Sequence, residues 1–506
     1  MSMQTFSRLV LLSAACVVAS AASCNHDNTN SSDLGKADLS ATDDLAGTGD
    51  GGTGSGDMVG TSGDMAMGLA LTGASPAQAP TTGNTDITLS GSGFLTGATV
   101  TIDGQAATVK SVSPSQILVT VPTRPGVKGL VNVVVTNPGG KTAASATIFG
   151  YYYGAITFDP PTNISVGGSP YNIAITELEN NAKADLVATD NSSSGKLLVM
   201  SGNGDGTFLP VAKYAAGIST FGLKVIDLNA DTFNDVVITN GTNTPSGVGL
   251  LFNSKTGTFP APVSYTSGDI PVSVDVKDIN GDGYLDMIVA NSGGASNNLS
   301  LLLGKAGGTL DVPRPLVAGN IPRSVLFVDV NKDGKTDIVA GNESSANVSV
   351  LLGDGAGNFA IKKDYSAGSG PYSVAATDFN GDGNIDLLVC LFKDASVALL
   401  TGNGDGTFAA PKATSIGTAM VSSPSSIALG DINADGRPDV VSAIYTDQQV
   451  GITLNVGGLL GNTLKLTATG FPRGVAVGDI NGDGKPDIVS ANPGNGSVLV
   501  FLNKSQ

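Results

Sequence analysis

A nine-residue segment rich in oxygen-bearing side chains recurs five times in nearly identical form. It reads DINGDGYLD from Asp278, DVNKDGKTD from Asp329, DFNGDGNID from Asp378, DINADGRPD from Asp431 and DINGDGKPD from Asp479. Positions 1, 3, 5 and 9 are Asp, Asn, Asp and Asp, and position 6 is Gly, which permits a sharp turn. Oxygen-only ligands with several carboxylates suit a hard cation, and this many candidate oxygens favours Ca²⁺ over Mg²⁺.

Two eroded copies precede these five. DLNADTFND from Asp227 keeps the four ligand positions but has Thr232 in place of Gly, so we expect weaker binding there. ELENNAKAD from Glu177 has Asn181 at position 5 and no Gly, so we expect it to be empty. The predicted ligands are Asp227, Asn229, Asp231, Asp235, Asp278, Asn280, Asp282, Asp286, Asp329, Asn331, Asp333, Asp337, Asp378, Asn380, Asp382, Asp386, Asp431, Asn433, Asp435, Asp439, Asp479, Asn481, Asp483 and Asp487.

The alternative interpretation is a set of hairpins without metal, because Asn, Asp and Gly all favour turns. Repeated clusters of three carboxylates would however repel one another unless a cation were present, so we expect Ca²⁺ in five to six loops, with a structural role. The segment resembles the start of an EF-hand loop. Position 12 is not Glu but, for example, Val289 or Val389, so we expect the aspartate at position 9 to replace that bidentate ligand.

The spacing of these segments indicates a repeat architecture. Their first positions are 177, 227, 278, 329, 378, 431 and 479, which are 48 to 53 residues apart. In each unit an alternating apolar run precedes the loop, a continuous apolar run follows it, and a third run leads to a Gly-rich turn that in several units ends at Phe, as at Phe208, Phe259, Phe359 and Phe408. About four antiparallel strands per unit are expected, and seven such units predict a seven-bladed β-propeller.

The ends of this repeat region supply a test of closure. The last unit stops at Gln506 before its fourth strand, and a matching segment with Phe158 stands before the first unit. We therefore expect residues 155–166 to pair with residues 497–502, which would remove both open edges of the ring.

These motifs resemble the FG-GAP/VCBS repeats of the integrin α-chain head and of many bacterial surface proteins. The resemblance covers residues 151–506 and implies calcium in the hairpins between the first and second strands of the blades, with ligand recognition on other loops. The turns GNGDGTF around Asp205 and Asp405 lack a ninth-position Asp, and we interpret them as tight hairpin turns.

Residues 69–150 show short β-branched runs separated by Gly, Pro and Asn, which is typical of a β-sandwich. The segments GSGF from Gly91, GATVTIDG from Gly97 and VTNPGG from Val135 resemble the IPT/TIG family of immunoglobulin-like domains, whose usual role is spacing or support. The expected fold class is all-β, with this sandwich before the propeller.

Residues 1–23 are typical of an export signal, and the small residues before Cys24 resemble a bacterial lipobox. We expect lipidation of Cys24, with simple cleavage near Ala22 as the alternative. Residues 24–68 are Gly-, Ser- and Asp-rich and predict a flexible acidic tether. The expected location is the bacterial cell envelope, as an outer-membrane lipoprotein, or the secreted fraction, with membrane attachment only through the lipid.

Composition narrows the function. Of 506 residues, 26 are basic and 43 acidic, so the net charge of −17 argues against nucleic-acid binding. The single histidine, His26, lies in the tether, and Cys390 stands alone in an apolar run, where we expect an inert core residue. We therefore predict a monomeric, non-enzymatic binding or adhesion module for a protein or glycan. The alternatives are an exported hydrolase or lyase acting on polysaccharide, and a scaffold of an envelope complex.

Overall fold

The computed structural model describes residues 68–125, 127, 129–241, 246–293, 298–418 and 421–506. All regular structure in these residues is β-strand, which confirms the all-β fold class. No helix in the described ranges could cross a membrane. The signal, Cys24 and the tether up to residue 67 lie outside the described residues.

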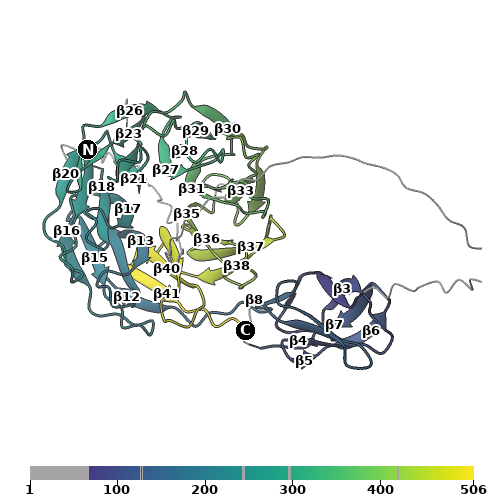
Figure 1. The fold of residues 1–506 in the computed structure, drawn as a ribbon. Helices are drawn as coiled ribbons and strands as arrows, with labels where there is room; N and C mark the ends of the chain where they lie inside the picture. The colour runs from purple at the N-terminus through teal and green to yellow at the C-terminus, as the bar shows by residue number, and fades with distance from the viewer. Residues whose placement is uncertain (1–67, 126, 128, 242–245, 294–297, 419–420) are drawn as a thin grey trace, which may run out of the picture.

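The N-terminal domain is a sandwich of two four-stranded sheets with a small third sheet (Figure 1). Ile87 and Leu89 alternate with more exposed residues and are fully buried between the sheets, as expected for one-sided strands. The strands, in sheet order, are β1 (Ala70–Ser75), β3 (Asp86–Ser92), β7 (Gln116–Thr120) and β6 (Thr108–Val112); β10 (Thr142–Ser145), β9 (Val133–Thr136), β4 (Thr99–Ile102) and β5 (Gln105–Ala106); and β2 (Gln78–Pro80), β11 (Gly150–Tyr152) and β8 (Gly129–Leu130). Because β11 pairs with β2 and β8, the sandwich extends two residues beyond the expected boundary at Gly150.

Seven four-stranded antiparallel sheets form the ring that Figure 1 shows. Their first strands are innermost, and each contacts the first strands of both neighbouring blades, with β39 against β13. These first strands are β13 (Pro170–Thr176), β17 (Thr220–Ile226), β21 (Pro271–Lys277), β27 (Pro322–Val328), β31 (Pro371–Thr377), β35 (Pro424–Gly430) and β39 (Gly474–Gly478).

The second strands are interior strands of their sheets, and the neighbouring blades cover their faces. They are buried along their whole length, which explains their continuous apolar sequences. They are β14 (Asp185–Asp190), β18 (Asp235–Asn240), β22 (Asp286–Asn291), β28 (Asp337–Asn342), β32 (Asp386–Leu391), β36 (Asp439–Ile444) and β40 (Asp487–Asn492). Cys390 lies in β32, fully buried, and burial raises the pKa of its thiol.

The outer half of each blade consists of a third and a fourth strand. The third strands are β15 (Lys196–Met200), β19 (Gly247–Leu251), β23 (Asn298–Leu302), β29 (Asn347–Leu351), β33 (Ser396–Leu400), β37 (Gln449–Val456) and β41 (Ser497–Phe501). The fourth strands are β16 (Ala212–Ala215), β20 (Val263–Thr266), β26 (Arg314–Val317), β30 (Lys363–Ser366), β34 (Lys412–Ser415), β38 (Leu459–Thr467) and β12 (Thr162–Ser165). A two-stranded ribbon, β24 (Gly304–Lys305) and β25 (Thr309–Leu310), connects β23 to β26.

The ring closes through its two ends. Strand β12 pairs antiparallel with β41, with Thr162 opposite Val500 and Ser165 opposite Ser497, and Phe158 bridges to Asn503. The predicted pairing of residues 155–166 with residues 497–502 is therefore present. The last blade takes its fourth strand, β12, from the start of the repeat region, so every sheet of the ring has four strands.

Candidate metal-binding loops

All seven candidate loops connect the first strand of a blade to its second strand, as in the step from β21 to β22. They follow the C-terminal ends of the innermost strands and therefore gather at one end of the ring. The predicted ligand residues of each loop stay together within a single hairpin, and no ligand set is shared between blades.

The side chains at positions 1, 3 and 5 fold the loop by accepting backbone hydrogen bonds. In the loop that begins at Asp278, the Asp278 carboxylate accepts the N–H of Gly283 (2.9 Å), the Asn280 amide oxygen accepts the N–H of Asp282 (3.0 Å), and the Asp282 carboxylate accepts the N–H of Tyr284 (2.9 Å). The equivalent three bonds are present in the loops at Asp227, Asp329, Asp378, Asp431 and Asp479. These hydrogen bonds turn each loop around its ligand positions.

The aspartate at position 9 has a role that the sequence analysis missed. In all seven loops this residue is 0% exposed, and its two carboxylate oxygens accept two backbone N–H groups at 2.7 to 3.1 Å. One comes from loop position 2, and the other comes from the second residue after the third strand or, in the blade of Asp439, from Asn455 near the end of β37. The donors are Leu178 and Gly202 to Asp185, Leu228 and Asn253 to Asp235, Ile279 and Gly304 to Asp286, Val330 and Gly353 to Asp337, Phe379 and Gly402 to Asp386, Ile432 and Asn455 to Asp439, and Ile480 and Asn503 to Asp487.

This aspartate is retained even where a metal is least expected. The loop at Glu177 has lost the position-5 carboxylate and the glycine, yet Asp185 keeps the same two bonds, from Leu178 and Gly202 (both 2.8 Å). The position-9 aspartate therefore has a structural role in every blade, in addition to the role as a metal ligand that the sequence predicts. The signal in the sequence was the survival of Asp185 in a copy that had lost its other motif residues.

The loops concentrate negative charge next to these buried carboxylates. Burial raises the pKa of Asp286, and the neighbouring Asp282 and Asp278 raise it further. Burial likewise raises the pKa of Asp235 to about 6 and that of Asp439 to about 7, again with a contribution from carboxylates of the same loop. Bringing these carboxylates together costs free energy that a bound cation would offset.

The donor set fits a hard cation such as Ca²⁺. In the part of the chain that the structure describes, no three acidic side chains are close enough to hold a metal by themselves, so Asn and backbone oxygens would have to complete any site. One atom supports such a site directly: Asp329 Oδ1 is buried and has no hydrogen-bond partner. A buried, unpaired carboxylate oxygen in an oxygen-rich loop is suited to accept a cation.

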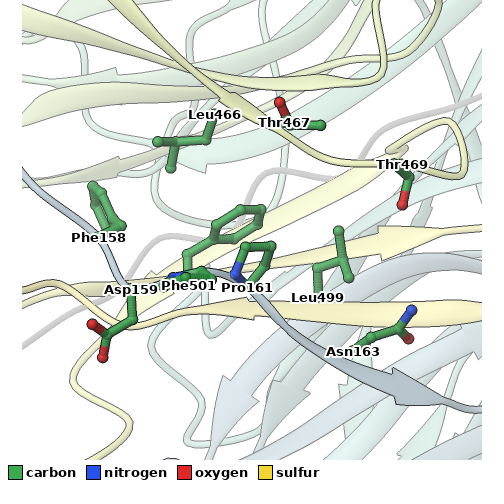
Figure 2. Close-up of a pocket in the computed structure, with 10 residues that line it drawn as sticks. Phe158, Asp159, Pro161, Asn163, Leu466, Thr467, Thr469, Leu499 and Phe501 are labelled. Atoms are coloured by element: carbon green, nitrogen blue, oxygen red, sulfur yellow. The ribbon is translucent and has the colours of Figure 1, made fainter.

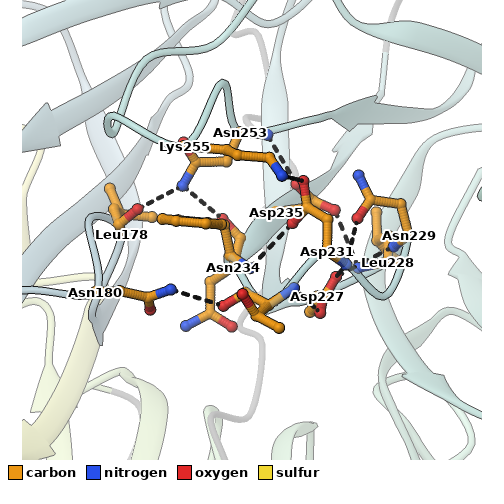
Figure 3. A network of polar contacts seen from close by, with 12 residues as sticks. Leu178, Asn180, Asp227, Leu228, Asn229, Asp231, Asn234, Asp235, Asn253 and Lys255 are labelled. Carbon is orange, nitrogen blue, oxygen red and sulfur yellow. Dashed lines mark hydrogen bonds and ion pairs between the residues drawn. The ribbon is translucent and has the colours of Figure 1, made fainter.

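The loop at Asp227, drawn in Figure 3, differs from the five complete copies at position 6. Thr232 has the positive φ of +75° that glycine has elsewhere, an unfavourable conformation for a β-branched residue. In addition, the Lys255 ammonium lies 3.7 Å from Asp231 Oδ2 and 5.6 Å from the centre of the Phe233 ring. A lysine also lies near the position-5 carboxylate of the complete copy at Asp329, where the Lys335 ammonium is 3.8 Å from Asp333 Oδ2, so this contact does not set the loop at Asp227 apart. Weaker calcium binding in the loop at Asp227 stays a prediction.

The loop at Asp431 is covered by the sandwich domain. Asn433 and Asp435 are only 5% and 8% exposed. The N–H of Tyr153 donates to the Asn433 carbonyl (2.7 Å), and the Gln78 amide donates to the Asp435 carbonyl. A cavity of about 500 Å³ lies beside these contacts, lined by both domains. This loop therefore joins the two parts of the chain, and Lys485 of the loop at Asp479 adds a contact, with its ammonium 5.5 Å from the centre of the Tyr153 ring.

The GNGDGTF segments are hairpin turns, as their sequence indicates. The N–H of Asn203 donates to the carbonyl of Thr207 (2.9 Å), and the Asp205 carboxylate accepts both the backbone N–H and the hydroxyl of Thr207. The turn around Asp405 repeats these contacts. Hydrogen bonds from the Thr207 hydroxyl and N–H lower the pKa of Asp205, which is committed to the turn.

A groove of about 480 Å³ follows the seam where the ring closes, between β12, β41 and the neighbouring β38 (Figure 2). Phe158, Leu466, Leu499 and Phe501 supply apolar walls. Its one carboxylate, Asp159, is half exposed and lies 3.7 Å from the Lys504 ammonium. This arrangement offers an apolar surface but no paired groups for bond-making chemistry.

The fold and these loops define a class, the seven-bladed β-propeller with an Asp- and Asn-rich hairpin in each blade. FG-GAP-like repeats match residues 227–289, 278–340, 329–389, 378–442 and 431–490, which together span more than half of the chain. The chain therefore belongs to the family of FG-GAP-like repeat proteins. An IPT/TIG domain matches residues 69–152.

Comparison with curated proteins found no match. Similar solved structures include an auxiliary nutrient binding protein from Bacteroides ovatus ATCC 8483, with 13% identity and a TM-score of 0.42 over 86% of this chain and 98% of that one. The periplasmic gluconolactonase of Pseudomonas aeruginosa has 14% identity and a TM-score of 0.44 over 68% and 93%. A functionally unknown protein from Desulfotomaculum acetoxidans DSM 771 has 14% identity and a TM-score of 0.45 over 72% and 96%.

Proposed function

We propose that this protein is a calcium-stabilised propeller that binds a protein or glycan ligand at the bacterial cell surface, where a lipid on Cys24 anchors it through the acidic tether. The observation that carries the calcium part is the repetition, at one end of a closed ring, of six loops with the same Asp, Asn and Asp at positions 1, 3 and 5. When bound, Ca²⁺ supplies the positive charge that these loops lack.

The protein's own residues would hold the ion in a simple division of labour. The carboxylates at positions 1 and 5, such as Asp278 and Asp282, provide charge, and the Asn at position 3 provides a neutral oxygen. The position-9 aspartate keeps the loop attached to its blade.

We treat the protein as a binding module and not as an enzyme. The carboxylates of the loops are committed to the fold, and Cys390 is buried within a blade, where it cannot reach a substrate. A rigid ring with different side chains at its other end is suited to presenting a recognition surface, and the tether would place that surface away from the membrane.

Calcium binding is tested by titration calorimetry and equilibrium dialysis of the mature chain, residues 24–506. We expect five to six bound Ca²⁺ per chain. D282N should lower this number by one, whereas N181A, in the eroded loop, should leave it unchanged. A stoichiometry near zero, or one that D282N does not change, would contradict the calcium proposal.

Ligand binding and anchoring need separate experiments. A glycan array and a pull-down from cell-surface extracts, each with calcium and with EGTA, should show ligands that are retained only with calcium. Growth with labelled palmitate should label the full chain but not C24A. Unlabelled protein that is released at full yield would favour a secreted form.

A further inference from the structure

The innermost strands begin with a repeated irregularity at the end of the ring opposite the metal loops. Between Pro322 and Ser324 of β27, and between Pro371 and Ser373 of β31, the pairing with the second strand shifts register. The same shift occurs at the start of β13, β17, β21 and β35. A bulge of this kind takes one residue out of the ladder and re-aims its side chain.

The residue at this position differs from blade to blade, unlike the loop residues at the other end. Around the ring it is Tyr171, Phe221, Val272, Arg323, Tyr372 and Ser425, and Arg473 holds the corresponding place just before β39. Figure 1 shows these strands surrounding the axis of the ring. Two arginines and two tyrosines from four different blades are thus brought to the inner edge of one end.

Arg323 is buried but not fully satisfied. Its residue exposure is 3%, its Nε donates to Glu343 Oε2 (2.7 Å), and its guanidinium lies 5.4 Å from the centre of the Tyr372 ring. Its Nη1 is buried and has no hydrogen-bond partner. Glu343 is shared with Lys393, whose ammonium lies 3.4 Å from the other carboxylate oxygen.

Arg473 carries a second unsatisfied guanidinium. It is 4% exposed, and its guanidinium lies 3.4 Å from the centre of the Tyr445 ring. Its Nη1 is also buried without a partner. None of the ion pairs found among the described residues includes Arg473. Burying an unpaired charge is costly, and a cation–π contact offsets only part of that cost.

The charges of both arginines act on Tyr372. Its ring stacks on Phe392 at 5.0 Å, and its hydroxyl is buried next to Tyr171. Burial raises the pKa of this hydroxyl, the neighbouring Tyr171 raises it further, and Arg323 and Arg473 both act in the opposite direction. Both guanidinium groups are therefore near enough to act on the same hydroxyl. The charges in this cluster, from Arg323, Lys393, Arg473 and Glu343, leave an excess of positive charge.

A strained aromatic residue borders the cluster. Phe471 is 37% exposed, has a φ of +62°, and its ring lies 5.2 Å from that of Tyr445, which contacts Arg473. Any side chain at Gly494 would collide with the Phe471 ring, 2.5 Å from the position of its Cβ. The equivalent residues Ile270 and Ile321 also have positive φ, so this conformation belongs to the turn before each innermost strand, and Phe471 places an exposed aromatic ring in that turn.

We propose that Arg323, Tyr372 and Arg473 bind a carboxylate group of the ligand, at the end of the ring opposite the metal loops. The donors are the unpartnered Nη1 groups of the two arginines together with the Tyr372 hydroxyl, and they suit the lone pairs of one carboxylate. Phosphate and sulfate have more oxygens than these donors can satisfy. The aromatic rings of Tyr445 and Phe471 would contact the less polar part of the same molecule. This inference rests on the proposed binding function and specifies its ligand chemistry.

The test is thermal-shift and calorimetric titration of the mature chain in saturating calcium at constant ionic strength, with galacturonate, malonate and acetate as probes. Galactose is the neutral match for galacturonate, and phosphate and sulfate form a separate arm. We expect at least one carboxylate to bind and to raise Tm. R323Q and R473Q should each weaken its binding by about tenfold or more, and Y372F by several-fold, since each loses a hydrogen bond to a charged group.

The matched control is R314Q, because Arg314 lies in the outermost strand β26 and donates to the Gly357 carbonyl (2.9 Å) away from this cluster. Y372F removes one oxygen atom and keeps the ring, so it distinguishes lost binding from lost folding. Equal binding of galactose and galacturonate, unchanged affinity in R323Q and R473Q, or no binding of any carboxylate would overturn the proposal. Arginine-dependent binding of phosphate or sulfate alone would also overturn it. Calcium stoichiometry measured on the same samples separates failure of this site from failure of the calcium proposal.

Discussion

Gly304 donates its N–H to Asp286 across 2.7 Å, and this bond ties the metal-loop hairpin to the residues that follow the third strand of the same blade. The other oxygen of Asp286 accepts the N–H of Ile279 inside the loop (3.0 Å). One buried carboxylate therefore connects two turns that are 18 residues apart. The same connection occurs in every blade, including the one with the eroded loop.

The first prediction concerns this connection. D286N and D185N should each lower the free energy of unfolding by about 1–3 kcal/mol, because an amide can accept only one of the two N–H groups and leaves the other buried without a partner. The loss should be the same with calcium and with EGTA for D185N. Urea unfolding in both buffers measures it. A harmless D185N would show that the position-9 aspartate acts through the metal and not through the fold.

The second prediction concerns calcium removal. A ligand at ten times its Kd stabilises the folded state by about 1.4 kcal/mol per site, so five or six sites together would contribute several kcal/mol. EGTA should therefore lower the Tm of the propeller by many degrees, and added Ca²⁺ should restore it, whereas Mg²⁺ should restore less. Scanning calorimetry provides the measurement, and superimposable curves with calcium and EGTA would disprove a stabilising role.

The third prediction concerns Thr232. T232G should stabilise the protein by about 1 kcal/mol, because it relieves the positive φ of a β-branched residue, and it should also strengthen calcium binding in the loop at Asp227. A182G, at the same position of the eroded loop with φ +59°, is the matched control. It should relieve strain without any change in calcium binding. If both variants changed the calcium isotherm equally, the predicted difference in calcium binding between these two loops would be contradicted.

The fourth prediction concerns the contact between the two domains. D431N should weaken the packing of the sandwich on the propeller, because the carbonyls of Asn433 and Asp435 in this loop accept hydrogen bonds from Tyr153 and Gln78. Limited proteolysis near Tyr152 should become faster in D431N and in EGTA. D278N, which alters a loop outside this contact, should show the wild-type rate in calcium. Equal acceleration in both variants would mean that the loop at Asp431 has no special part in the interface.

The repeat pattern determined much of the fold from the sequence. The 48- to 53-residue spacing, the apolar runs and the displaced segment around Phe158 were sufficient to predict seven blades and the closing pair of β12 and β41. They were sufficient because each blade is a local unit, so that hydrophobic period and turn residues specify its strands without knowledge of distant contacts. The grouping of the loop residues at positions 1, 3 and 5 was predictable for the same reason.

Only the tertiary structure decided the roles that depend on contacts between separate elements. Asp286 became a backbone acceptor because its second donor, Gly304, lies beyond another strand, and loop spacing contains no information about that distance. Arg323, Tyr372 and Arg473 are about 50 residues apart from one another or more, and they converge because the ring brings the starts of their strands to one axis. The special position of Asp431 arises from the docking of the sandwich. In each case the sequence specified the local unit, and closure of the ring specified which units meet.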